Sequence, residues 1–123
     1  MKIWIDILTP KQLLFSEPIV ERLGVKHDLL CTSREYEEVS KLSKIRHFDL
    51  MFVGKHGGGD KKTKLEASIK RINKLSKKIE KFKPDLVISF GSPEAARISF
   101  GLGIKHIMFC DSPHANAVMR LTL

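Results

Sequence analysis

The sequence predicts an α/β fold with three layers, in which a five-stranded parallel sheet lies between two layers of helices. Two observations carry this prediction. Five short runs along the chain are almost continuously apolar, which is typical of strands that are buried on both faces of a parallel sheet. The segments between these runs show helical periodicity or helix-capping residues, and this alternation is typical of a wound α/β domain. The 123 residues have the length of one such domain, and we expect 1–123 to form it.

The five expected strands are rich in β-branched and aromatic side chains. They cover Ile3–Ile7, Asp28–Thr32, Asp49–Val53, Asp85–Phe90 and Lys105–Phe109. Crossovers between parallel strands are right-handed, and ligands of such sheets bind beyond the carboxyl ends of the strands. We therefore expect function in the segments that follow these ends, which are Asp6–Gln12, Thr32–Glu35, Gly54–Asp60, Gly91–Glu94 and Cys110–Asn116.

The first two helices are expected between the first three strands. Pro18–Leu23 is expected to be helical, because proline suits the first turn and Gly24 suits the position after a helix end. Arg34–Lys44 is expected to form the second helix, because its first turn is acidic and so interacts favourably with the helix dipole.

The third helix has the clearest periodicity, with apolar residues at steps of three and four. These are Leu65, Ile69, Ile72, Leu75, Ile79 and Phe82. Thr63 and Glu66 have the spacing of a capping box at its start, and Pro84 ends the pattern. The fourth helix is expected over Pro93–Leu102, with Ser92 as its cap and Gly103 after its end, and a short fifth over His114–Leu121.

The net charge of +8 comes from one part of the chain. Residues 55–83 hold eleven basic and three acidic residues, and the remainder sums to zero. A basic surface attracts phosphates, nucleic acid or an anionic membrane surface. A solvated lysine-rich helix is the alternative. Nucleic acid is the weakest of these partners, because lysine outnumbers arginine and no aromatic residues are interleaved.

Several functional classes are excluded by missing motifs. The first expected strand is not followed by the glycine-rich fingerprint of dinucleotide-binding folds, and no P-loop, metalloprotease or hydrolase motif occurs. No apolar run is long enough to span a membrane, and Asp6 interrupts the start of the chain where a signal peptide would be apolar. We therefore expect a cytoplasmic protein without a cofactor, in which Cys31 and Cys110 are free thiols.

Two glycine-containing segments are candidate ligand-binding sites. Gly57, Gly58 and Gly59 follow the third strand, beside Lys55 and His56, and their backbone N–H groups can approach an anion closely. A mobile connector is the alternative. Gly91, Ser92 and Glu94 begin the fourth helix, where unpaired N–H groups attract phosphates or carboxylates. Ser92 acting only as a helix cap is the alternative there.

Three acidic or basic side chains are candidates for acid–base chemistry. Asp111 and His114 follow the fifth strand, and a general acid or base is the favoured interpretation. A metal site that adds Cys110 is the weaker alternative, and we expect no resident metal. Asp6 ends the first strand inside an apolar run, where a buried carboxylate needs a partner or a function. It either caps the following loop or lies in the active cleft, and we favour the cleft.

Four stretches together resemble an archaeal family of unknown function, which is similar to GT-B glycosyltransferases and UDP-N-acetylglucosamine 2-epimerases. They are Ile3–Gln12, Val53–Gly58, Ser92–Glu94 and Asp111–Ala115. The family has two Rossmann-like halves, and the chain resembles the first. The resemblance implies a Rossmann-like domain with strand order 3-2-1-4-5. It also implies that this half binds the acceptor and supplies the catalytic base, while the second half binds the nucleotide-sugar donor.

The resemblance also assigns roles to individual residues. Asp111 lies near a glutamate of the epimerases and related transferases, and Ser92 near an epimerase aspartate used in acid–base chemistry. The serine argues against a faithful epimerase mechanism. Thr9, Lys11 and Gln12 would line the cleft floor with Asp6. The Gly57–Gly59 loop would contact an acceptor phosphate or a membrane headgroup.

The resulting hypothesis is an acceptor-side domain of the GT-B type that is inactive without its second half. The expected strand order leaves Ile107–Phe109 on a sheet edge, which predicts self-association or a separate second-half partner at that edge. One alternative is a stand-alone anion-binding or nucleic-acid-binding module that uses the basic segment 55–83. Another is an inactive truncated product.

Overall fold

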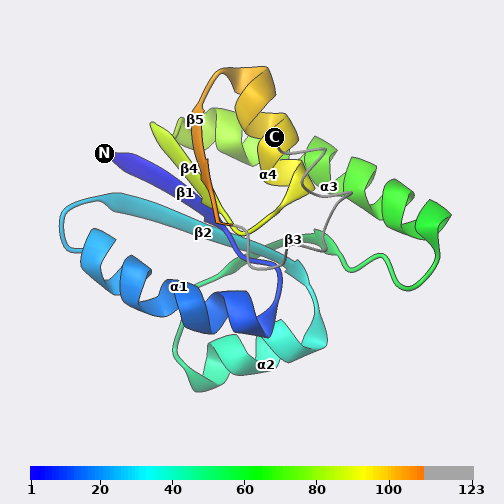
Figure 1. Cartoon of the computed structure of the whole chain (residues 1–123), viewed down its shortest axis with the longest axis horizontal. Helices are drawn as coiled ribbons and strands as arrows, with labels where there is room; N and C mark the ends of the chain where they lie inside the picture. Colours follow the sequence, from blue (N-terminus) through cyan, green and yellow to red (C-terminus); the bar gives the residue numbers. More distant parts are fainter. Residues whose placement is uncertain (110–123) are drawn as a thin grey trace.

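The computed structural model describes residues 1–109, in which five strands and four helices alternate along the chain (Figure 1). All strand pairs are parallel and the strand order is β3-β2-β1-β4-β5, which confirms the predicted α/β fold. The elements are β1 (Lys2–Asp6), α1 (Pro10–Leu23), β2 (Asp28–Glu35), α2 (Glu37–Ile45), β3 (Met51–Lys55), α3 (Lys61–Phe82), β4 (Leu86–Ser89), α4 (Pro93–Leu102) and β5 (Lys105–Met108). The expected fifth helix lies outside the described residues.

Helices cover the sheet on both faces, with α1 and α2 on one side and α3 and α4 on the other (Figure 1). Alternate residues of the central strands therefore enter two different cores. Ile3 and Ile5 of β1 pack in the core beneath α1 and α2, with Leu13 and Val39. Trp4 of β1 is fully buried in the core beneath α3 and α4. A strand that contributes side chains to two cores has a continuous apolar sequence, which is why the sequence identifies β1 so clearly.

The first helix begins eight residues earlier than the expected start at Pro18. The Thr9 side chain accepts a hydrogen bond from the Gln12 N–H at 3.2 Å, and Pro10 occupies the first turn. Thr9-Pro10 is therefore the start signal, and Pro18 lies inside the helix. The correction places Gln12 in the first turn of α1, beside the end of β1.

The second expected helix also starts too early, because β2 continues to Glu35 and α2 begins only at Glu37. The pairing of β2 with β3 changes register between Ser33 and Glu35. Two residues of β2 then correspond to three of β3, so the extra residue of the bulge lies on β3, next to Gly54. The predicted helical residue Arg34 is thus part of a strand end.

The third and fourth helices agree with the sequence to different degrees. Asp60, not Thr63, caps α3, so the expected capping box is wrong. Pro84 follows the end of α3 as expected. Helix α4 is confirmed at both ends, because the Ser92 hydroxyl accepts from the Ala95 N–H at 3.1 Å and Gly103 adopts φ +68° after the last turn. No helix within 1–109 is long and apolar enough to cross a membrane.

Candidate functional site

The segments that follow β1, β2, β3 and β4 surround a cavity of about 370 Å³. This is the carboxyl edge of the sheet, where the strand order predicts ligand binding. We call it the carboxyl-edge cavity. Seven residues that the sequence selects line it, and these are Thr9, Gln12, Lys55, His56, Gly57, Gly91 and Glu94.

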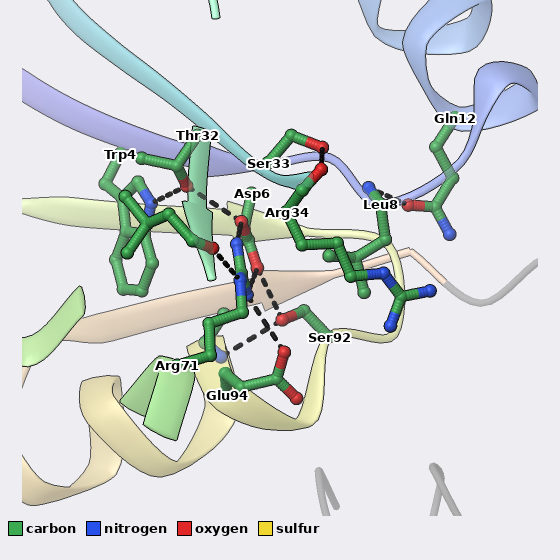
Figure 2. Close-up of polar contacts among 12 residues, drawn as sticks. Trp4, Asp6, Leu8, Gln12, Thr32, Ser33, Arg34, Arg71, Ser92 and Glu94 are labelled. Carbon is green, nitrogen blue, oxygen red and sulfur yellow. Dashed lines mark hydrogen bonds and ion pairs between the residues drawn. The ribbon is translucent and has the colours of Figure 1, made fainter. Parts of the chain in front are cut away.

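A buried ion pair lies beneath the cavity (Figure 2). Asp6 at the end of β1 is fully buried, and Arg71 of α3 is 1% exposed. The Arg71 guanidinium donates to both Asp6 carboxylate oxygens, at 2.6 and 2.9 Å. Its Nε donates to the Val53 carbonyl at 2.9 Å. This two-pronged geometry connects β1, β3 and α3 at one point.

Further hydrogen bonds extend the ion pair to β2 and α4 (Figure 2). The Thr32 hydroxyl donates to Asp6 at 2.8 Å and accepts from the Trp4 indole N–H at 2.7 Å. The Ser92 hydroxyl donates to Asp6 at 2.6 Å while it caps α4. All members of this chain of contacts are satisfied, which makes it a rigid floor for the cavity.

Glu94 forms the border between this floor and the cavity. One of its oxygens accepts from Arg71 at 3.0 Å and the other from the Ser68 hydroxyl at 3.1 Å. Glu94 is 4% exposed and lies in the first turn of α4, where a carboxylate interacts favourably with the helix dipole. Both of its oxygens are thus already bonded within the protein.

The charged state of the floor follows from its contacts. Burial alone would raise the pKa of Asp6, but Arg71 and the hydroxyl donors outweigh burial and hold the pKa below its usual value. Burial likewise opposes the charge of Arg71, and the two neighbouring carboxylates raise its pKa above the usual value. Asp6 and Arg71 therefore stay ionised at neutral pH.

Two glycines allow the backbone to approach α3 closely. Gly54 has φ +79°, and a Cβ there would lie 2.7 Å from the Arg71 Cγ. At Gly57 a Cβ would lie 2.7 Å from the Lys64 Cα. The loop after β3 therefore packs directly on the first turns of α3, and it brings Lys55 and His56 to the cavity.

His56 is held in a defined orientation. Its ring stacks on Tyr36 with a centroid distance of 4.7 Å, and its Nδ1 accepts from the Gly58 N–H at 3.2 Å. Slight loss of contact with water lowers the pKa of this largely exposed ring, and the charges of Arg34 and Lys64 lower it further. The ring is consequently neutral at pH 7, with its proton on Nε2.

Arg34 reaches the cavity from the end of β2. Its Nε is inaccessible to water and has no hydrogen-bond partner among residues 1–109. In Figure 2 the guanidinium points away from the Asp6–Arg71 pair, toward the side of Leu8 and Gln12. Burial lowers the pKa of Arg34 below its ordinary value, and nearby Arg71 contributes in the same direction.

The remaining predicted residues take different positions. Gln12 lines the cavity, but its amide already accepts from the Leu8 N–H and donates to the Phe90 carbonyl. Ser92 is buried as the cap of α4, which supports the structural alternative for this residue. Lys11, Gly58 and Gly59 are exposed and lie outside the cavity lining.

Asp6 lies under the cavity floor, with Arg71 as its partner, and its catalytic role stays a prediction. Asp111 and His114 lie outside the described residues. Within 1–109, no group of three or more His, Cys, Asp or Glu side chains could hold a metal ion.

Sequence reasoning missed four residues of this region, and three come from one helix. Lys64, Ser68 and Arg71 of α3 line the cavity together with Arg34. Arg71 lies four residues before Leu75 and eight before Ile79, a spacing that places it on the buried side of α3, and this periodicity was the available signal. Arg34 lies in the segment Thr32–Glu35 where function was expected, but it was not selected as a site residue, because it was assigned to the start of the second helix and not to the end of β2.

A second hollow, of about 660 Å³, lies between α1, β2 and the segment 46–51 that connects α2 to β3. None of the predicted site residues that fall within 1–109 lines it. Its wall includes Cys31, whose pKa burial raises to about 12, so that the thiol is protonated and unreactive at neutral pH. The larger hollow therefore offers less chemistry than the carboxyl-edge cavity.

Comparison with known families matches residues 1–123 to the family described as "Protein of unknown function (DUF354)". The chain belongs to this family. An uncharacterized protein of Methanocaldococcus jannaschii is 32% identical over 126 residues, covering 100% of this chain and 36% of that protein. The chain thus spans about a third of the length of this curated DUF354 relative, and the predicted family resemblance is confirmed.

Solved structures of two kinds share the fold of this DUF354 chain. The UDP-GlcNAc 2-epimerase of Neisseria meningitidis has a TM-score of 0.79 at 17% identity, over 99% of this chain and 38% of that one. Spinosyn forosaminyltransferase SpnP has a TM-score of 0.75 at 16% identity, over 98% of this chain and 33% of that one. The UDP-GlcNAc 2-epimerase of Methanocaldococcus jannaschii has a TM-score of 0.71 at 18% identity, over 88% of this chain and 31% of that one. At these identities the similarity establishes the Rossmann-like fold of GT-B proteins.

Proposed function

We propose that this chain is the acceptor-side half of a sugar-transferring enzyme of the GT-B type, and that it needs a second lobe for turnover. The carboxyl-edge cavity carries the proposal. It lies where ligands of parallel sheets bind, and basic and hydroxyl side chains line it above a rigid, fully hydrogen-bonded floor. The chain covers 38% or less of the three solved structures described above, which leaves room for a donor-binding lobe in the complete enzyme.

The proposed division of labour follows the residues. Thr9, Lys55 and the loop at Gly57 would bind a sugar-bearing or phosphate-bearing acceptor in the cavity. Asp111 or His114 would take the proton from an acceptor hydroxyl as its oxygen attacks the anomeric carbon of the donor sugar, and the nucleoside diphosphate would leave with the bonding electrons. The nucleotide would be held by the second lobe, outside this chain.

Isothermal titration calorimetry with UDP-N-acetylglucosamine tests this proposal. We expect no saturable binding to the chain alone, and binding after the chain is mixed with the segment that follows the matched region in a full-length relative. Glucose 1-phosphate serves as a ligand for the acceptor side. Tight binding of the nucleotide sugar by the chain alone would contradict the assignment of donor binding to a second lobe.

The alternative of a stand-alone anion-binding module rests on the exposed lysines of α3. Lys70, Lys74 and Lys77 lie on its exposed face, whereas Arg71 of the same segment is buried and paired. Retention on RNA or DNA that weakens steeply with salt, with a slope reduced by neutralising these three lysines, would favour this second function.

A further inference from the structure

We propose that the carboxyl-edge cavity binds the phosphate group of the ligand, and that Arg34 is the residue that anchors it. The identification of this ligand as the acceptor of sugar transfer rests on the proposed function, whereas the phosphate-binding site does not. The phosphate-binding site itself rests on three observations about the cavity. They are the position of Arg34, the balance of charges and the free donors on the cavity wall.

The position of Arg34 leaves one of its donors unused. The Nε is shielded from water and has no partner within 1–109, and a buried donor in this state costs about 1–3 kcal/mol. Glu94 is the acidic residue whose charge acts most strongly on Arg34, but its two oxygens already accept from Arg71 and Ser68. The guanidinium is directed away from the Asp6–Arg71 pair (Figure 2). An oxyanion in the cavity would compensate the charge of this guanidinium and could pair with its outer N–H groups, since the shielded Nε is closed to a ligand as it is to water.

The charges around the cavity do not balance. Four cations and two carboxylates line it or lie directly beneath it, which leaves a formal charge of +2. The six residues are Arg34, Lys55, Lys64 and Arg71, with Asp6 and Glu94. His56 adds no charge, because its pKa is lowered. A phosphate monoester carries about −1.5 to −2 at pH 7, which matches the excess. A neutral sugar would leave this excess of two positive charges without compensation.

The remaining wall suits a phosphate that is attached to a sugar-sized group. The Thr9 hydroxyl accepts from the Gln12 N–H and keeps its own proton for a ligand oxygen. Lys55 and Lys64 are exposed and can follow the ligand, whereas Arg34 is held by β2 and presents a planar fork that matches phosphate oxygens. A volume of about 370 Å³ is in the range of small-ligand sites.

Phosphate binding to the full chain tests the inference. Glucose 1-phosphate and inorganic phosphate are titrated calorimetrically at constant ionic strength into the wild-type chain, Arg34→Gln and Lys81→Gln. Lys81 is an exposed residue of α3 outside the cavity, so both variants remove one positive charge. We expect Arg34→Gln to weaken glucose 1-phosphate binding about tenfold or more, and Lys81→Gln to change it by less than about twofold. Circular dichroism checks folding, and Lys64→Gln replaces Arg34→Gln if the latter does not fold.

Each outcome decides the inference. Equal weakening by the cavity variant and Lys81→Gln, or no binding by the wild type at millimolar concentrations, would overturn it. Vesicles with phosphatidic acid, compared with phosphatidylcholine vesicles, form a second arm. Binding of these vesicles that depends on Arg34, without binding of glucose 1-phosphate, would assign the phosphate to a lipid headgroup. Binding of glucose 1-phosphate alone would assign it to a soluble ligand. Tight binding of UDP-N-acetylglucosamine would contradict the proposed function and leave the phosphate site standing.

Discussion

Arg71 joins three elements of the fold through its guanidinium, which bonds Asp6 of β1, Glu94 of α4 and the Val53 carbonyl of β3. Counted along the sequence, it is one of eleven basic residues in a lysine-rich segment. The structure separates it from the others, because it is buried and compensated while its neighbour Lys70 is exposed. Charge counting therefore identified the basic helix but not the residue that organises the site.

Replacing Arg71 tests its structural role. Arg71→Met leaves the Asp6 carboxylate buried without its partner, and we expect the free energy of unfolding to fall by about 3–5 kcal/mol. Lys70→Met removes the same charge from the exposed face of the same helix and should change it by less than about 0.5 kcal/mol. Urea denaturation measures both. A loss below about 1 kcal/mol in Arg71→Met would mean that the ion pair does not hold these elements together.

The lowered pKa of His106 makes the free energy of unfolding depend on pH. Its Nε2 lies 2.7 Å from the Ser89 hydroxyl oxygen, and partial burial lowers its pKa below the ordinary value of 6.5. The unfolded chain therefore binds this proton more readily than the folded chain, and stability falls as the pH drops through about 6.5. His56 shifts in the same direction, whereas Asp6 acts only below its ordinary value of 3.8.

The measurement is the free energy of unfolding between pH 7.5 and 5.5, where these shifts act. We expect the wild type to lose stability across this range and His106→Gln to lose less. The double variant with His56→Gln should lose less still. An unchanged pH slope in His106→Gln would show that its neutral form is not favoured by folding.

At the scale of elements, the sequence prediction was accurate where the signal lies in neighbouring residues and inaccurate where it depends on distant ones. Helix α4 was predicted at both ends, because Ser92, Pro93 and Gly103 act within one turn. The start of helix α1 was misplaced because Thr9 and Pro10 are also common in loops. Their role as a helix start becomes clear only from the hydrogen bond that the Thr9 side chain accepts from the Gln12 N–H. The bulge between β2 and β3 could not be predicted, because it depends on the pairing of two distant segments.

Gly54 lies in β3 at this change of register, and its substitution tests how closely β3 approaches α3. Its φ of +79° and the Arg71 side chain at 2.7 Å leave no room for a Cβ, and we expect Gly54→Ala to lower the free energy of unfolding by about 1–3 kcal/mol. Gly59→Ala is the matched control, because nothing lies within 4 Å of its added Cβ. It should change stability by less than about 0.5 kcal/mol. Equal effects of the two substitutions in chemical denaturation would contradict the proposed close approach of β3 and α3.

At the scale of the whole molecule, the parallel sheet and the carboxyl-edge location of the cavity were predictable from alternation alone, because parallel sheets place the loops after their strands at one edge. The strand order was predicted from the family resemblance instead. The composition of the site was only half predictable. Lys55 and His56 adjoin a strand end, but Lys64 and Ser68 reach the cavity only because the Gly57 loop packs on α3. That packing is a tertiary contact with no local signature.

Strand β5 forms one edge of the sheet, where we predict self-association or pairing with a separate second half. Ile107 is 47% exposed on this edge strand, and Phe15 and Phe109 beside each other are 55% and 40% exposed. We expect concentration-dependent self-association in sedimentation velocity, weakened by Ile107→Lys, because a charge on an edge strand opposes strand pairing. Lys105 on the same strand supplies the control substitution Lys105→Gln. A monomer at all concentrations would contradict self-association.

The most direct test of the account is a two-dimensional amide spectrum of the ¹⁵N-labelled chain titrated with glucose 1-phosphate. We expect the largest shifts to map to Arg34, Gly57 and Gly91, which come from three different strand ends around one cavity. Shifts that map instead to the exposed face of α3, or to the hollow between α1, β2 and residues 46–51, would contradict the claim that this domain binds its ligand at the carboxyl edge.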